Sequence, residues 1–79
     1  MLKQGSVVVS LKGKDKNRLL CVAALNENGV WVCDGRKRRL NNPKRKNPKH
    51  LKALDKVLSA EQMRTDKQLR KALKFNPEA

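Results

Sequence analysis

Short apolar runs separated by polar turns occupy the first third of the chain and predict a small antiparallel sheet. Residues 5–12, GSVVVSLK, are rich in β-branched side chains and predict a strand. Residues 18–25, RLLCVAAL, are apolar almost throughout, which indicates a strand that is covered on both faces. The polar residues 13–17 between them, GKDKN, predict a turn.

Two glycine-containing turns predict how the sheet continues. Residues 26–29, NENG, favour a hairpin turn, because Asn and Gly are the residues that tolerate positive φ. Residues 30–33, VWVC, are then expected to pair back on residues 18–25. Asp34 and Gly35 predict a second two-residue turn with a return strand at residues 36–40.

The sequence predicts that a final short strand closes this sheet. Residues 41–48 hold two prolines and are expected to form an extended loop, and residues 49–51 a brief fifth strand. Strands so short and so close together indicate a strongly bent sheet that closes into a small barrel. The fold class is therefore predicted as mainly β.

The periodicity changes after residue 52 and predicts a short C-terminal helix. Ser59 with Gln62, and Thr65 with Gln68, fit capping boxes. Residues 66–74 place three apolar side chains on one helical face. The further expectations are that Phe75 holds the helix end, that Pro77 stops the helix, and that the linker docks through Leu54, Val57 and Leu58. We thus divide the chain into a barrel at 1–52, which includes a basic segment at 36–52, and a linker with the helix at 53–79.

The charge is concentrated in the basic segment. The 79 residues include 20 Lys or Arg against 7 Asp or Glu, for a net charge of +13. Nine basic side chains and no acidic one fall in residues 36–52, which therefore supply +9 of this total. Such a density indicates a polyanionic partner, although a solvated basic face is the alternative. Nucleic acid is favoured over an anionic membrane, because Pro43 and Pro48 interrupt any amphipathic helix.

The polar residues indicate no reaction chemistry. Cys21 and Cys33 lie in apolar runs on either side of the hairpin, which is typical of small buried thiols and not of a four-ligand zinc site. His50 has only Lys, Pro and Leu beside it, and a catalytic imidazole needs a nucleophile or a carboxylate. Asp15 and Asp34 fall in turns, where local backbone bonds account for them. We predict a protein that is not an enzyme, with no catalytic residue, metal or cofactor.

The scarcity of aromatic residues restricts how nucleic acid could be bound. Trp31 and Phe75 are the only two, so no stacking platform for single-stranded bases is expected, and Trp31 is assigned to the sheet. Recognition is then expected to use phosphates and the shape of a folded RNA. The basic segment supplies the candidate RNA-binding residues Arg36, Lys37, Arg38, Arg39, Lys44, Arg45, Lys46, Lys49 and His50. The helix cations Lys67, Arg70 and Lys71 are expected to matter far less.

Residues 5–22, GSVVVSLKGKDKNRLLCV, resemble the KOW motif, in which a glycine, an apolar strand, a glycine-centred turn and a second apolar strand follow one another. Gly13 stands at the most characteristic glycine of that motif. Asn17 stands where many KOW motifs have a second glycine, and Asn also tolerates a left-handed turn. Together with VWVCDGR and NPKHL, the match over residues 5–52 resembles short bacterial KOW-domain RNA-binding proteins. These are similar to archaeal and eukaryotic large-subunit ribosomal proteins of the L14e/L6e/L27e group.

The resemblance implies an SH3-like β-barrel that binds RNA, usually ribosomal RNA of the large subunit. The RNA contacts of the KOW loop carry over to Lys12, Gly13, Lys14, Lys16, Asn17 and Arg18. We expect a monomeric protein that associates with ribosomal or other structured RNA, with ribosomal proteins as further partners.

Two other functions stay open. KOW domains of transcription factors also dock polymerase or partner proteins, so one is a protein-interaction module, and the other is nucleoid-type DNA binding. The start MLKQG lacks a signal-peptide core and no apolar run is long enough to span a bilayer, so we expect a cytoplasmic protein without membrane contact.

Overall fold

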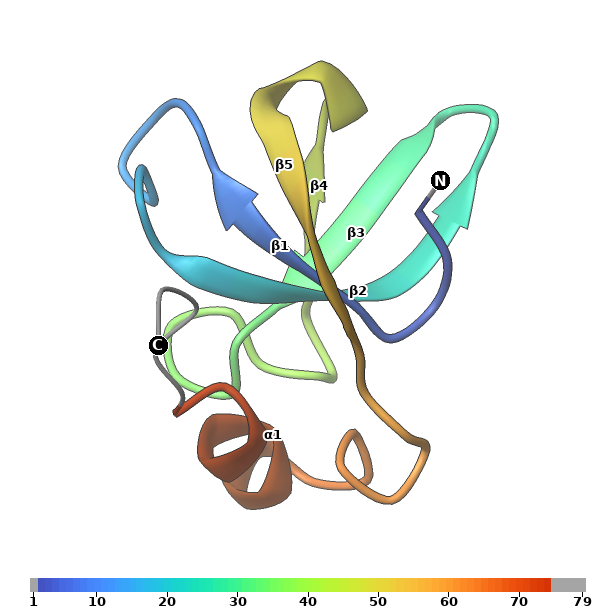
Figure 1. Ribbon diagram of the computed structural model, residues 1–79, viewed down its shortest axis with the longest axis vertical. Coiled ribbons are helices and arrows are strands. Elements are labelled where there is room, and N and C mark those ends of the chain that lie inside the picture. Colours follow the sequence, from blue (N-terminus) through green and yellow to red (C-terminus); the bar gives the residue numbers. More distant parts are fainter. Residues whose placement is uncertain (1, 75–79) are drawn as a thin grey trace.

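The structure is a computed structural model that describes residues 2–74, and its main element is one antiparallel sheet. The strand order is β4-β3-β2-β1-β5, so the sheet is open (Figure 1). This confirms a mainly β fold with one short helix. The elements in chain order are β1 (Ser6–Ser10), β2 (Leu19–Asn26), β3 (Gly29–Cys33), β4 (Lys44–Lys46), the 3-10 helix η1 (Pro48–His50), β5 (Leu51–Val57) and α1 (Asp66–Ala72).

The first three strands lie where the apolar runs predicted them. β1 pairs with β2 through Val8 and Leu20, and β2 pairs with β3 through Cys21 and Cys33. The hairpin between β2 and β3 turns at Asn26–Gly29, where the Asn28 N–H donates to the side chain of Asn26 at 2.7 Å. The local turn chemistry of Asn and Gly therefore fixes this register, as expected.

The predicted return strand at residues 36–40 is wrong. Asp34 Oδ1 accepts the backbone N–H groups of Arg36 and Arg38 at 2.8 and 3.0 Å, and the Arg38 carbonyl accepts the N–H groups of Asp34 and Gly35. A side chain thus takes the hydrogen bonds that a strand ladder would have used, and the backbone bends back on itself. The partner of β3 is instead β4, with Trp31 opposite Arg45.

Two further expectations for this part of the chain are wrong. β4 lies inside the segment 41–48 that was expected to be a loop, at the sheet edge where neighbouring prolines are tolerated. Of the brief strand expected at 49–51, the first two residues lie in η1, and Leu51 begins the strand β5, which is seven residues long. β5 pairs with β1, so residues 53–57 belong to the sheet and not to a linker.

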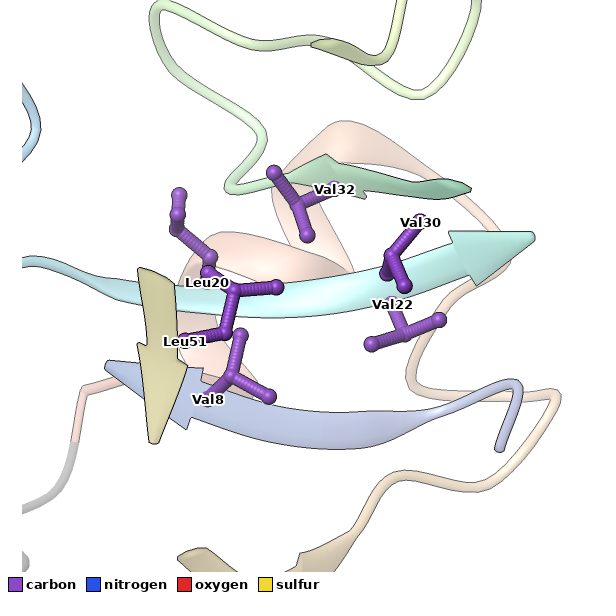
Figure 2. Packing of buried hydrophobic residues seen from close by; sticks show 6 residues of the cluster. All are labelled: Val8, Leu20, Val22, Val30, Val32 and Leu51. Carbon is purple, nitrogen blue, oxygen red and sulfur yellow. The ribbon is translucent and has the colours of Figure 1, made fainter. Parts of the chain in front are cut away.

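The sheet buries apolar side chains on both of its faces. One cluster gathers Val8, Leu20, Val22, Val30, Val32 and Leu51, which point toward one another from four strands (Figure 2). The other cluster contains Val7, Cys21 and Cys33 and is covered by Leu58 and Leu69. Neighbouring residues of a strand point to opposite faces, which explains why the nearly continuous apolar run of β2 serves both clusters.

Helix α1 covers the second cluster and begins at the predicted cap. Thr65 Oγ1 accepts the Gln68 N–H at 3.1 Å, and the buried Leu69 faces the sheet. The helix ends at Ala72, two residues earlier than expected. The box of Ser59 and Gln62 is also present, with reciprocal bonds of 2.9 and 3.2 Å, but it closes a turn and not a helix.

Two sequence-based expectations cannot be placed on this fold. The roles predicted for Phe75 and Pro77 lie outside the described residues. Over residues 2–74, no helix has the length and apolar character to cross a membrane.

Substitution of Leu20 and of Leu25, both on β2, distinguishes the effect of core packing on stability from the effect of strand propensity. Leu20 is fully buried, whereas Leu25 is 40% exposed. Leu20→Ala should lower the free energy of unfolding by about 2–5 kcal/mol, because it leaves a cavity in the first cluster. Leu25→Ala should cost less than about 1 kcal/mol. Urea unfolding followed by circular dichroism measures both, and equal losses would contradict the observed placement of β2.

Candidate nucleic-acid interface

The turn between β1 and β2, here called the first basic loop (residues 11–18), presents lysines around a left-handed backbone. Gly13 has φ +84° and Asn17 has φ +70°, so both residues occupy the conformation that their types tolerate best. The Asn17 N–H donates to the Ser10 carbonyl at 2.8 Å and closes the loop. Three lysines extend from this loop as exposed side chains: Lys12, Lys14 and Lys16.

The segment after β3, here called the second basic loop (residues 34–39), is organised by Asp34. That residue is 7% exposed, and its carboxylate holds the loop backbone through Arg36 and Arg38. Because the backbone folds around this carboxylate, the side chains of the loop are turned outward. Three of them are exposed: Arg36, Lys37 and Arg39.

The two basic loops are joined by a reciprocal pair of ionic contacts. Asp15 of the first loop is 4% exposed, and its Oδ2 lies 3.8 Å from Arg38 Nε of the second loop. Asp34 Oδ2 of the second loop lies 3.8 Å from Arg18 Nη1 of the first. At these distances the attraction is coulombic, without a direct hydrogen bond. Each loop therefore carries a buried acid that faces an arginine of the other loop.

Lys46 ties strand β4 to the same assembly. Its Nζ lies 3.7 Å from Asp15 Oδ2 and donates to Ser10 Oγ at 3.1 Å and to the Lys12 carbonyl at 3.3 Å. Only 10% of this side chain is exposed. Lys46 thus links the edge of the sheet to two oxygen atoms of the first basic loop and to Ser10 at the end of β1.

The candidate cations fall into two structural groups. One group faces protein oxygen atoms: Arg18, Arg38 and Lys46, together with Arg45, which is exposed but whose Nε donates to the Asn28 carbonyl at 2.9 Å. The other group is exposed: Lys12, Lys14, Lys16, Arg36, Lys37, Arg39, Lys44 and Lys49. His50 is half-buried within η1, and its carbonyl accepts the Leu11 N–H at 2.8 Å.

The sequence interpretation of the aspartates is correct for one and incomplete for the other. Asp34 does bind its own loop backbone, as expected. Asp15 instead directs its carboxylate to Arg38 and Lys46, which follow it by 23 and 31 residues. No local pattern signals partners at such separations, so sequence reasoning missed the contacts that bring the two loops together.

Sequence reasoning also gave too little weight to the helix as a neighbour of these loops. Arg70 Nη1 donates to the Gly35 carbonyl at 2.7 Å, and the Leu40 N–H donates to Asp66 Oδ1 at 2.8 Å. A Cβ at Gly35 would lie 2.5 Å from the Asp66 carbonyl oxygen, so only glycine permits this approach. In Figure 1 helix α1 accordingly lies beside the green loop that follows β3.

The thiols are buried and do not offer a nucleophile at neutral pH. Burial, and then the neighbouring Cys33, raise the pKa of Cys21 from 9.0 to about 12. Burial, and then Asp34 and Asp66, raise the pKa of Cys33 to about 12. Both cysteines are free. Among the described residues, no three His, Cys, Asp or Glu side chains are grouped so that they could hold a metal ion.

Comparison with known proteins does not assign the chain to a family. No protein-family model matches the sequence, and a search of curated proteins finds no significant match. The resemblance to the KOW family therefore rests on residues 5–22 and the motifs that follow them, and it stays a prediction.

Substitution of Asp15 tests whether its carboxylate holds the loops together. Asp15→Asn should lower the free energy of unfolding by about 1–3 kcal/mol, because the largely buried Lys46 loses its counter-charge. Glu27→Gln is the matched control, since Glu27 is exposed at the hairpin and the substitution changes the net charge equally. Thermal unfolding measures both variants. A melting temperature equally reduced in the two would show that Asp15 acts only through net charge.

The raised thiol pKa values predict a loss of stability in alkali. The unfolded chain releases its thiol protons near pH 9.0, whereas the native chain keeps them to about pH 12. The unfolded state binds fewer protons in this interval, so the free energy of unfolding falls above pH 9, by up to about 1.4 kcal/mol per pH unit for each thiol. Urea midpoints between about pH 8 and pH 10 measure the fall. Cys33→Ala should remove about half of it, and an unchanged slope would contradict this origin.

Proposed function

We propose that this protein is a non-catalytic RNA-binding protein that uses the two basic loops to bind ribosomal or other structured RNA in the cytoplasm. The observation that carries the proposal is the reciprocal pairing of Asp15 with Arg38 and of Asp34 with Arg18. The two carboxylates are buried, and burying a carboxylate is costly unless a partner compensates its charge. Here they hold two loops rich in exposed cations beside each other, and this favours one continuous surface for a polyanion.

The chemistry of the exposed side chains favours backbone recognition. Exposed lysines serve as point charges toward phosphates, and exposed arginines add forked hydrogen bonds. The only tryptophan, Trp31, lies on β3 opposite Arg45, is half-buried and belongs to neither basic loop. A surface with these properties is suited to the phosphates of folded RNA, where shape and charge are recognised more than bases.

The same proposal includes the SH3-like barrel of the KOW family as the architecture. Its support is the curvature of the sheet: Leu51 of β5 shares one cluster with Val30 and Val32 of β3, although two strands, β2 and β1, lie between β3 and β5 in the sheet. Gly13 and Asn17 also adopt the left-handed conformations that a KOW turn requires. In this architecture the first basic loop is the KOW loop, for which the family resemblance implies RNA contact.

Removal of the lysines from the first basic loop tests the proposal. Lys12→Gln/Lys14→Gln/Lys16→Gln should weaken binding to a folded fragment of large-subunit ribosomal RNA at least about tenfold. The slope of log affinity against log salt should fall by about two, because each lost phosphate contact removes roughly 0.7–0.9. Fluorescence anisotropy over a series of salt concentrations measures both quantities.

The matched control removes the same charge elsewhere. Lys3→Gln/Lys67→Gln/Lys71→Gln also removes three exposed lysines, and it should change affinity and slope much less. Equal effects of the two triple variants would show that only net charge matters. A wild-type protein that ignores the RNA at low salt would refute the function, and stronger binding to duplex DNA of equal length would favour the DNA alternative.

A further inference from the structure

A hollow of about 410 Å³ lies where helix α1 meets both basic loops. Its walls come from three parts of the chain that are up to 57 residues apart. Leu19 and Leu73 form the apolar part of the wall. The polar part consists of Asn17, Arg18, Asp34, Arg36, Arg70 and Lys74.

The charges around the hollow favour an anion. Four of its side chains are cationic and one is a carboxylate, that of Asp34. This carboxylate is already engaged, because its Oδ1 accepts two backbone N–H groups and its Oδ2 faces Arg18. Arg36 and Lys74 are exposed and lie at the solvent side of the hollow. The hollow therefore presents a surplus of positive charge toward solvent.

Arg70 is oriented by the fold. Its Nη1 donates to the Gly35 carbonyl at 2.7 Å, and this bond leaves the remaining guanidinium donors for another acceptor. The helix that carries Arg70 is fixed by the buried Leu69 and by the close approach of Gly35 to Asp66. The guanidinium is consequently positioned before any ligand arrives, which reduces the entropy lost on binding.

A basic residue in the last helical turn also has a purely structural role, because it compensates the negative end of the helix dipole. Lys71 lies in the same turn as Arg70 and serves that role equally well. Lys71 and Lys67 are exposed but do not line the hollow. Arg70 of α1 and Lys74, two residues beyond its end, thus line the hollow, whereas Lys67 and Lys71 of α1 do not.

We infer that helix α1 is part of the RNA interface and that this hollow receives a backbone phosphate of the RNA, bound by Arg70 and Lys74 together with Arg18 and Arg36. The inference rests on the proposed function and extends it to a segment that sequence analysis expected to matter little. The lining residues include no aromatic side chain for stacking, so the ligand is a phosphodiester and not a base.

The test compares two double variants within the C-terminal segment 66–74. Arg70→Gln/Lys74→Gln should weaken binding to the folded ribosomal RNA fragment at least about tenfold and lower the log–log salt slope by about one to two. Lys67→Gln/Lys71→Gln removes the same charge and should weaken binding less than about threefold. Lys74→Gln alone keeps the bond between Arg70 and Gly35, so it reports on the hollow even if the double variant loses helix docking.

The outcomes separate this inference from the function on which it rests. Equal losses in the two double variants, with normal binding by the wild type, would overturn the role of the hollow and leave the first basic loop as the interface. A wild type that binds no RNA would refute the function itself. Poly-glutamate binding that is lost in the Arg70→Gln/Lys74→Gln variant, while RNA affinity stays unchanged in that variant, would also overturn the inference and identify a site for acidic protein segments.

Discussion

The reciprocal contacts between buried aspartates and arginines are the constraint on which the basic surface depends. In a chain with a net charge of +13, electrostatic repulsion opposes the approach of two cationic loops. Asp15 and Asp34 offset this repulsion, since each lies inside one loop and attracts an arginine of the other. Lys46 adds the edge strand β4 to the same group. Arg18, Arg38 and Lys46 thus help to position the loops that carry the exposed cations.

The two-sided sheet explains why the helix lies beside the second basic loop. A chain of this size buries only a small apolar core, and here that core is divided between two clusters. The second cluster lies on the other face of β1, β2 and β3 and needs Leu69 of α1 as a cover. The requirement for that cover brings the helix next to Gly35, and Arg70 arrives beside the basic loops with it.

The sequence predicted those features that depend on interactions between residues close together in the chain. The apolar runs of β1 to β3, the Asn–Gly hairpin and the Thr65 cap depend on residues at most a few positions apart, and all are present. The predictions failed where a side chain competes with the backbone, as Asp34 does, and where the partner is distant, as for β5. Of the candidate site, the exposed cations could be listed from the sequence, but their grouping by Asp15 and the proximity of Arg70 could not.

The position of β5 in the sheet has a consequence for how the nascent chain acquires its structure. β1 lies between β2 and β5, and the Leu58 N–H donates to the Gly5 carbonyl at 2.8 Å. The hairpins of β1 with β2 and of β2 with β3 form from neighbouring residues, whereas one edge of β1 waits until residues 51–58 have left the ribosome. During that interval Val7 and Val8 lack part of their cover. The pairing of β5 with β1 is therefore a late, long-range event in the synthesis of this protein.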